Sequence, residues 1–145
     1  MLLDQKTLPL VAIDFMNDVH LEDLDIINAL FELILQYEQN PTEENKENLN
    51  NQYKEWISHT IEHFHKEEVM MEEKNFPPYP IHKAEHDNAL NQMNLIFEEW
   101  NKTNNINILK QYFIEKLPTW LTNHIKTMDT VTAMFFKTGL SPCGG

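Results

Sequence analysis

The chain has 145 residues, enough for one domain over residues 1–145, and its 41% hydrophobic content is normal for a soluble globular protein. It carries 23 acidic residues against 11 basic ones, a formal net charge of −12, and has no cluster of Lys and Arg. This charge disfavours nucleic acid and anionic membranes as partners, and the lack of a membrane-length apolar run or a basic leader predicts a cytoplasmic protein.

The glycines exclude a further class of function. Only Gly139, Gly144 and Gly145 occur, so no Gly-rich loop could cradle the phosphates of a nucleotide. The same scarcity favours long helices joined by short loops. Residues 139–145 are expected to form a flexible tail, in which Cys143 is a free thiol.

Apolar residues recur at spacings of three and four through most of the chain, which predicts amphipathic helices. Residues 1–16 are expected to form an extended arm packed onto the body. The helices are expected, in chain order, from Asn17 or Asp18 to about Gln39, from Thr42 to about Lys74, from Pro80 to about Asn101 and from Ile106 to about Lys137. Pro118 predicts a kink in the fourth helix, or a break that makes residues 118 onward a separate segment. Residues 17–138 therefore predict an all-α, up-down-up-down four-helix bundle.

The second predicted helix contains the most informative stretch, HTIEHFHKEEVMM, from His59 to Met71. His63 and Glu67 stand four residues apart, so their side chains lie on one face and can reach a shared point. They share a stripe with Trp56 and Met70, which should face the core. A buried carboxylate is costly unless it has a cationic partner, a shifted pKa or a metal ion.

The other predicted helices also place histidines on their inward stripes. His20 heads the stripe of the first helix, His82 and His86 stand four apart on the third, and His124 lies on the fourth. Two imidazoles four residues apart can bind one metal ion. Histidines converging from every helix beside Glu67 indicate a metal site far better than a set of separately satisfied core residues.

The motifs resemble those of the hemerythrins, specifically the single-domain bacterial hemerythrins. The matching segments are His20, HFHKEEVMM for the family's HFxxEExxM, HKAEH for HxxEH and WLTNHIKTMD for WLxxHIxxxD, within roughly residues 13 to 136. The resemblance implies two non-haem iron ions bound by seven side chains: His20, His63, Glu67, His82, His86, His124 and Asp129.

The resemblance also implies how these ligands are shared. His82, His86 and His124 bind one iron, His20 and His63 bind the other, and Glu67 and Asp129 bridge both. With an oxo or hydroxo bridge from solvent, one position stays open on the second iron for dioxygen.

Asp129 depends on the resemblance alone, because a five-residue step from His124 turns roughly 140° around a regular helix. A longer reach, or a local irregularity in the helix, would bring its carboxylate to the metal ions. By the same resemblance, Trp120, Leu121 and Ile125 are expected to line an apolar pocket over the open iron.

The implied function is reversible binding of dioxygen for carriage, storage or sensing, rather than an enzyme activity. A ferritin-like di-iron oxidase or a peroxide-scavenging protein is an alternative, although the ferritin plan needs two ExxH motifs and only Glu62 to His65 fits. A zinc hydrolase with HKAEH as its HxxEH motif and Glu85 as its base is a remote one.

The sequence also predicts where residues around the site lie. His65 and Glu68 are expected on the surface and Met70 in the core. His59 lies either at the edge of the site or in solvent. The sequence leaves the oligomeric state open, with a monomer allowed.

Overall fold

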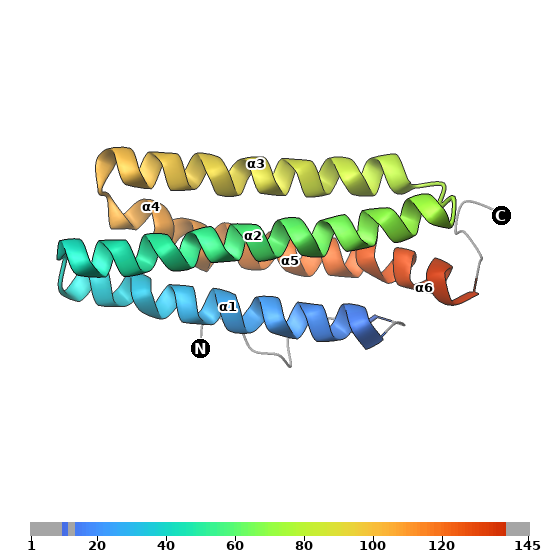
Figure 1. Ribbon diagram of the computed structural model, residues 1–145, viewed down its shortest axis with the longest axis horizontal. Helices are drawn as coiled ribbons and strands as arrows, with labels where there is room; N and C mark the ends of the chain where they lie inside the picture. The colour runs from blue at the N-terminus through green and yellow to red at the C-terminus, as the bar shows by residue number, and fades with distance from the viewer. Residues whose placement is uncertain (1–9, 12–13, 139–145) are drawn as a thin grey trace.

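The computed structural model describes residues 10–11 and 14–138, and these form a bundle of long helices. The helices run lengthwise beside one another, and the chain reverses direction at each connection (Figure 1). The first three are α1 (Asp14–Gln39), α2 (Glu43–Glu73) and α3 (Tyr79–Thr103), and the fourth is a run of α4 (Ile106–Gln111), η2 (Tyr112–Lys116), α5 (Leu117–His124), η3 (Ile125–Asp129) and α6 (Thr130–Thr138). The prediction of an all-α, up-down-up-down bundle is confirmed.

The first helix packs against α2 and α4, and α3 packs against the same two neighbours. Sequence neighbours are thus also spatial neighbours, as short connections between antiparallel helices require. None of the described helices is both long enough and apolar enough to cross a membrane.

The helix boundaries follow from capping residues. The Thr42 hydroxyl oxygen accepts a hydrogen bond from the backbone N–H of Asn45 at 3.1 Å and so caps α2. Asn104 ends α3 with a left-handed backbone (φ 54°), which asparagine tolerates better than most residues. The next residue, Asn105, caps α4 by accepting the N–H of Asn107 at 3.1 Å. The NKTNN connection therefore needs no glycine.

The start of α1 corrects the predicted boundary of the N-terminal arm. The helix begins at Asp14, so residues 14–16 are helical rather than extended. Asn17 is not the N-cap, because its side chain accepts the N–H of Val11 and donates to the Val11 carbonyl, both at 2.9 Å. These bonds hold the buried Val11 against the bundle. Residues 1–9 and 12–13 of the predicted arm, and the tail at 139–145 with Cys143, lie outside the described residues.

The fourth helix is continuous from residue 106 to residue 138, so the break predicted at Pro118 does not occur. A π-helical turn, η2, comes just before the proline, and the Leu117 N–H bonds to the Tyr112 carbonyl five residues back. Pro118 then stands directly after this turn, in the first turn of α5, and helix continues on both sides of it. The π-turn thus lets the helix carry a proline without interruption.

An aromatic core fills the half of the bundle that holds the end of α1 and the start of α2. Tyr53 stacks on Phe97 with ring centroids 4.5 Å apart, and its hydroxyl donates to the Met93 carbonyl at 2.7 Å. Trp100 is fully buried and donates its indole N–H to Asn50 Oδ1 at 2.9 Å. Each buried polar atom of these rings therefore has a partner, as a dense core requires.

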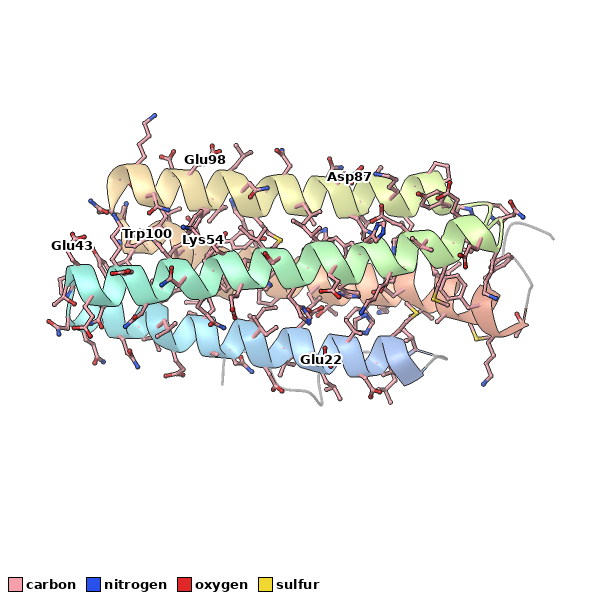
Figure 2. The ribbon with its side chains drawn as sticks, in the orientation of Figure 1. Glu22, Glu43, Lys54, Asp87, Glu98 and Trp100 are labelled. Carbon is pink, nitrogen blue, oxygen red and sulfur yellow. The ribbon has the colours of Figure 1, made fainter. Side chains whose placement is uncertain are left out.

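Charged side chains cover the outside of the bundle. Figure 2 shows Asp87 and Glu98 on the outer side of α3, and both are exposed. The polar cluster described next lies inside the other half of the bundle, where the apolar core gives way to histidines and carboxylates.

Candidate metal centre

Side chains from every helix of the bundle meet at the site. All seven predicted ligand residues are brought together and none is more than 8% exposed: His20, His63, Glu67, His82, His86, His124 and Asp129. Burying this many polar side chains without partners would cost several kcal/mol, so their contacts decide what the cluster can do.

The first group consists of three imidazoles and two carboxylates whose ligand atoms all lie within 4.8 Å of one another. His82 Nε2 lies 3.3 Å from His124 Nε2 and 3.1 Å from Asp129 Oδ1. Glu67 and His86 complete the group, with Glu67 Oε1 3.4 Å from His86 Nε2. Five nitrogen and oxygen donors at such distances can surround a single metal ion.

The second group consists of His20, His63 and Glu67. His63 Nε2 lies 2.6 Å from the second oxygen of Glu67, Oε2. His20 Nε2 lies 3.0 Å from Asp129 Oδ2, while the other oxygen of Asp129 faces His82 and His124. Each carboxylate therefore offers one oxygen to each group, which is the arrangement of a bridging ligand.

Asp129 reaches the cluster because the helix widens locally. Residues 125–129 form the π-helical turn η3, and the Thr130 N–H bonds to the Ile125 carbonyl five residues back. One such turn takes up five residues, so Asp129 returns to the face of His124, and Asp129 Oδ1 lies 3.2 Å from His124 Nε2. The sequence prediction had offered a helical irregularity as one of two explanations, and the structure contains it.

Most of the imidazoles make a contact through Nδ1, the ring nitrogen that faces away from the cluster, with a side-chain oxygen. His82 Nδ1 lies 2.8 Å from the Thr132 hydroxyl, His86 Nδ1 lies 3.2 Å from Glu68 Oε2, and His124 Nδ1 lies 2.8 Å from Glu85 Oε1. An Nδ1–H that donates outward leaves the Nε2 lone pair free to bind a metal, and fixes the orientation of the ring.

His63 is held by Asp23 of α1, which also contacts a second histidine. Asp23 Oδ2 lies 2.9 Å from His63 Nδ1, and Asp23 Oδ1 lies 2.8 Å from His59 Nδ1. Burial opposes the charge on Asp23, but the two imidazoles outweigh it and lower the pKa of this carboxyl. Burial also lowers the pKa of His63, yet Asp23 and Glu67 together raise it to about 11. The pair therefore keeps its opposite charges across the neutral range.

The two carboxylates inside the cluster are also held ionised. Burial is the largest influence on Glu67 and, with the nearby charge of Asp129, raises its pKa, but contacts with His63 and His86 bring it below its ordinary value. Burial opposes ionisation of Asp129 in the same way, and neighbouring imidazoles, led by His124, hold its pKa well below its usual range. Buried negative charge at this density requires positive charge beside it, from protons on the imidazoles or from metal cations.

Three atoms of the cluster test whether metal ions fit. Among the described residues, seven buried side-chain atoms have no hydrogen-bond partner, and three of them belong to the first group: Glu67 Oε1, Asp129 Oδ1 and His86 Nε2. An unsatisfied buried polar atom costs about 1–3 kcal/mol. All three point into the first group, where a bound cation would satisfy them at once, so the donor set fits a metal centre.

A small cavity of about 30 Å³ adjoins the second group. Its lining includes His20 and His63 of this group, His124 and Asp129 of the first group, and apolar side chains such as Phe64, Trp120 and Leu121. The volume is roughly what one water molecule occupies in the liquid, so one small molecule fits beside this group. The predicted pocket residues Trp120 and Leu121 line it, and Ile125 is fully buried in the adjacent core.

Four residues near the site were predicted with different success. His65 is exposed, as expected. Glu68 was predicted on the surface, but its side chain is only 15% exposed and contacts His86. Met70 is only half-buried, while the next residue, Met71, is fully buried, so the core assignment was one residue out. His59 lies at the edge of the site, 27% exposed and in contact with Asp23.

The outer partners Asp23, Glu68, Glu85 and Thr132 were not identified from the sequence. A signal existed for two of them, since Glu68 directly follows Glu67 and Glu85 directly precedes His86, and metal-binding histidines usually donate to a carboxylate. Asp23 and Thr132 do not stand next to a ligand in the sequence. All four partners lie on other helices than the rings they contact, so only the assembled bundle reveals the pairs.

The contacts also bear on the alternative sites. Glu85 holds the outer nitrogen of His124, so it is not placed as the base of a zinc hydrolase acting on water at the cluster. Glu62 and His65, the ExxH pair that the ferritin plan would use, are both exposed. Neither alternative accounts for the buried cluster.

Comparison with known proteins gives a consistent set of relatives. A family model described as the hemerythrin HHE cation binding domain matches residues 11–135. The bacteriohemerythrin of Aquifex aeolicus (strain VF5) is 28% identical over 119 residues, which cover 82% of this chain and 86% of that protein. The bacteriohemerythrin of Ralstonia nicotianae (strain ATCC BAA-1114 / GMI1000) is 32% identical over 51% of this chain and 53% of its own length. Hemerythrin subunit 1 of Golfingia vulgaris is 33% identical over 60% of each chain. No solved structure gives a significant match.

Proposed function

Because the chain belongs to the hemerythrin HHE cation-binding family, we propose that its buried cluster holds two iron ions and binds dioxygen reversibly. In this proposal His82, His86 and His124 hold one iron and His20 and His63 hold the other. Glu67 and Asp129 bridge the pair, together with an oxo or hydroxo group from solvent. The open position belongs to the two-histidine iron, which lies beside the cavity.

The observation that carries the proposal is the division of the cluster into two donor groups that share Glu67. Three histidines serve one group and two serve the other, while both carboxylates present an oxygen to each. This asymmetry leaves one ion with fewer protein ligands. Both of its histidines, His20 and His63, line the cavity, whereas of the other three histidines only His124 does. Imidazole and carboxylate donors suit iron, which supplies the electrons that dioxygen needs for binding.

The wall of the cavity favours binding over reaction. The Thr60 hydroxyl donates to the Trp56 carbonyl at 2.8 Å, and burial raises the pKa of the Tyr112 phenol, so neither is a ready proton donor. Asp23 is held as a carboxylate. The rest of the lining consists of side chains assigned to the metal ions, namely His20, His63, His124 and Asp129, and of apolar side chains that disfavour water, so a bound dioxygen can leave unchanged.

Metal analysis and optical spectroscopy test the proposal. Purified protein exposed to air should contain two iron ions per chain, show ferric charge-transfer bands in the near ultraviolet, and gain a visible band on oxygenation that disappears when dioxygen is removed. Substituting His82 with Ala should abolish one iron site, because this ring faces both Asp129 and His124. Two zinc ions, or fewer than one iron per chain, would contradict the proposal.

The exposed His65 provides the matched control on the same helix as His63. Its replacement by Ala should leave iron content and spectrum unchanged. If both substitutions had the same effect, the ligand assignment would be wrong.

Carriage, storage and sensing all use this site, and the autoxidation rate separates them. Slow autoxidation supports carriage or storage in the cytoplasm, where we place the protein. Rapid autoxidation supports sensing or a reaction with peroxide.

A further inference from the structure

The small cavity beside the second donor group is next to a much larger hollow on the surface. This outer hollow has a volume of about 610 Å³ and lies between α3 and the η2–α5 part of the fourth helix. Its rim is polar, with residues such as Asn88, Gln92 and Lys116. A small molecule in solvent can therefore collect within one side-chain layer of the inner cavity.

Three residues separate the two spaces, because Ala89, Tyr112 and Trp120 line both of them. Trp120 is held in place by stacking on His124, with ring centroids 4.5 Å apart and an angle of 11° between the planes. Tyr112 is anchored by ring contacts with Trp56 and Phe113. Of the three, only Ala89 has no side chain beyond Cβ, so the partition is thinnest where its methyl group stands.

A second hollow, of about 250 Å³, lies on another side of the site, between α1 and α2. It shares only His63 with the inner cavity, and its wall carries charged residues such as Glu22, Glu62 and Lys66. Here the ion-paired imidazoles of His59 and His63 with Asp23 fill the space between hollow and cavity. A neutral diatomic molecule would have to displace these charged contacts to pass.

We propose that small neutral ligands enter and leave the metal centre between α3 and α5, past Ala89, and that the size of this residue sets the rate of passage. Tyr112 and Trp120 form the fixed sides of the opening. Because protein interiors are densely packed, transit requires a brief opening fluctuation, and its cost rises with the bulk that must move. A larger side chain at position 89 slows entry and exit alike, since the barrier lies between the two spaces.

The inference rests on the proposed iron centre, and the test separates the two. The iron-loaded, reduced protein is mixed with dioxygen and, separately, with nitric oxide, a neutral diatomic ligand of ferrous iron. Ala89→Leu should lower both the association and the dissociation rate constant by about tenfold. Ala89→Gly should raise both rate constants, and it serves if the bulkier variant fails to fold.

Two controls add bulk elsewhere. Asn88→Phe enlarges the neighbouring residue, which lines only the outer hollow, and Val19→Phe fills the hollow between α1 and α2. Neither should change the rate constants.

Equal rates in all Ala89 variants, or slowing by Val19→Phe instead, would overturn the route while leaving the iron centre standing. A protein that holds iron and fails to bind dioxygen reversibly, yet shows the Ala89 pattern with nitric oxide, would support the route and overturn the proposed function. Failure to take up iron would overturn both.

Discussion

At the level of single residues, the histidines differ in what holds them from behind. His82, His86 and His124 each have an outer partner, from Thr132, Glu68 and Glu85 in turn. In the two-histidine group, His63 Nδ1 lies at ion-pair distance from Asp23 Oδ2, 2.9 Å, whereas no ion pair or hydrogen bond is found at His20 Nδ1 among the described residues. The three-histidine position is therefore the better preorganised of the two, and the orientation of the other depends strongly on Asp23.

This dependence predicts the effect of Asp23→Asn. The amide keeps the size of the side chain but loses the negative charge that orients and polarises His63, so affinity for the second metal ion should fall by about 10- to 100-fold. Titration of the metal-free protein with ferrous iron against a competing chelator measures both binding constants. The first ion should bind as in the unchanged protein.

Glu22 gives a matched control for this prediction. It is the neighbouring acid on α1 (Figure 2), and its side chain is 65% exposed and 3.4 Å from His59. Glu22→Gln removes the same charge without touching His63, and should leave both constants unchanged. An equal loss in the two variants would show that bulk negative charge, and not the Asp23 contact, matters.

The sequence was most informative at this scale. Spacing alone placed five histidines and Glu67 on inward faces, because each lies on a stripe that reaches apolar residues in steps of three and four residues. Asp129 came only from the resemblance of WLTNHIKTMD to the family motif, since regular helix geometry points it elsewhere. Asp23 could not be recognised, because a carboxylate three residues after His20 gives no sign of its contact with a histidine on α2.

At the level of helices, the π-turns of the fourth helix adapt its sequence to the bundle. The hydrogen bond in η3 spans five residues, whereas an α-helical hydrogen bond spans four. Asp129 at the end of η3 and Thr132 after it both face the cluster. Such a turn behaves as a single inserted residue, with regular helix on either side in its proper register. The broad boundaries of all four helices were predictable from caps and periodicity, but neither π-turn was, because no residue type specifies one.

This view predicts that the inserted residue can be removed. Deleting the exposed Thr127 should convert η3 into an α-helical turn and keep Asp129 on the face of His124, four residues away instead of five. The variant should hold two metal ions per chain, as measured by metal analysis, and unfold at an equal or higher temperature.

Deletion of Asn123 is the contrasting case, since this exposed residue lies in the regular helix α5. There the loss of one residue rotates His124 by about 100° relative to α5, so one donor group loses a ring. Loss of metal in the Thr127 deletion, or its retention in the Asn123 deletion, would contradict the assignment of η3 as a removable insertion.

At the level of the whole molecule, the buried charges couple the stability of the bundle to protons and metal ions. Metal ions and protons compete for the same nitrogen and oxygen atoms, so the metal-free protein depends on its own ionisation for stability. The pKa of His63 is raised on folding, and those of Glu67, Asp129 and Asp23 are lowered.

These directions predict a stability maximum for the metal-free protein on the acid side of neutrality. Because folding raises the pKa of His63 from 6.5 to about 11, its contribution is full below pH 6.5 and is lost as the pH rises toward 11. The carboxyls contribute above their ordinary pKa values, 4.5 for Glu67 and 3.8 for Asp129, and lose this contribution at lower pH. Urea unfolding from about pH 3 to pH 10 should show both limbs.

A variant isolates the alkaline limb of this profile. His63→Phe removes the group whose pKa rises, so the loss of stability between pH 6.5 and about 11 should become smaller while the acid limb persists. A profile that stays flat from pH 6 to pH 10 in the unchanged metal-free protein would refute the prediction.

The bridging position of Asp129 has a topological consequence. His20 and Asp129 meet although 109 residues separate them, and Glu67 joins the same centre from the middle of the chain. Metal ions held by these residues would act as cross-links that close nearly the whole polypeptide into nested loops, much as disulfides do, and would remove conformational freedom from the unfolded chain. Fraying of a single helix end would not free an ion, because each ion would be held by side chains from several helices at once. Release of metal would therefore require the helices to part, so metal exchange would proceed at the pace of bundle opening.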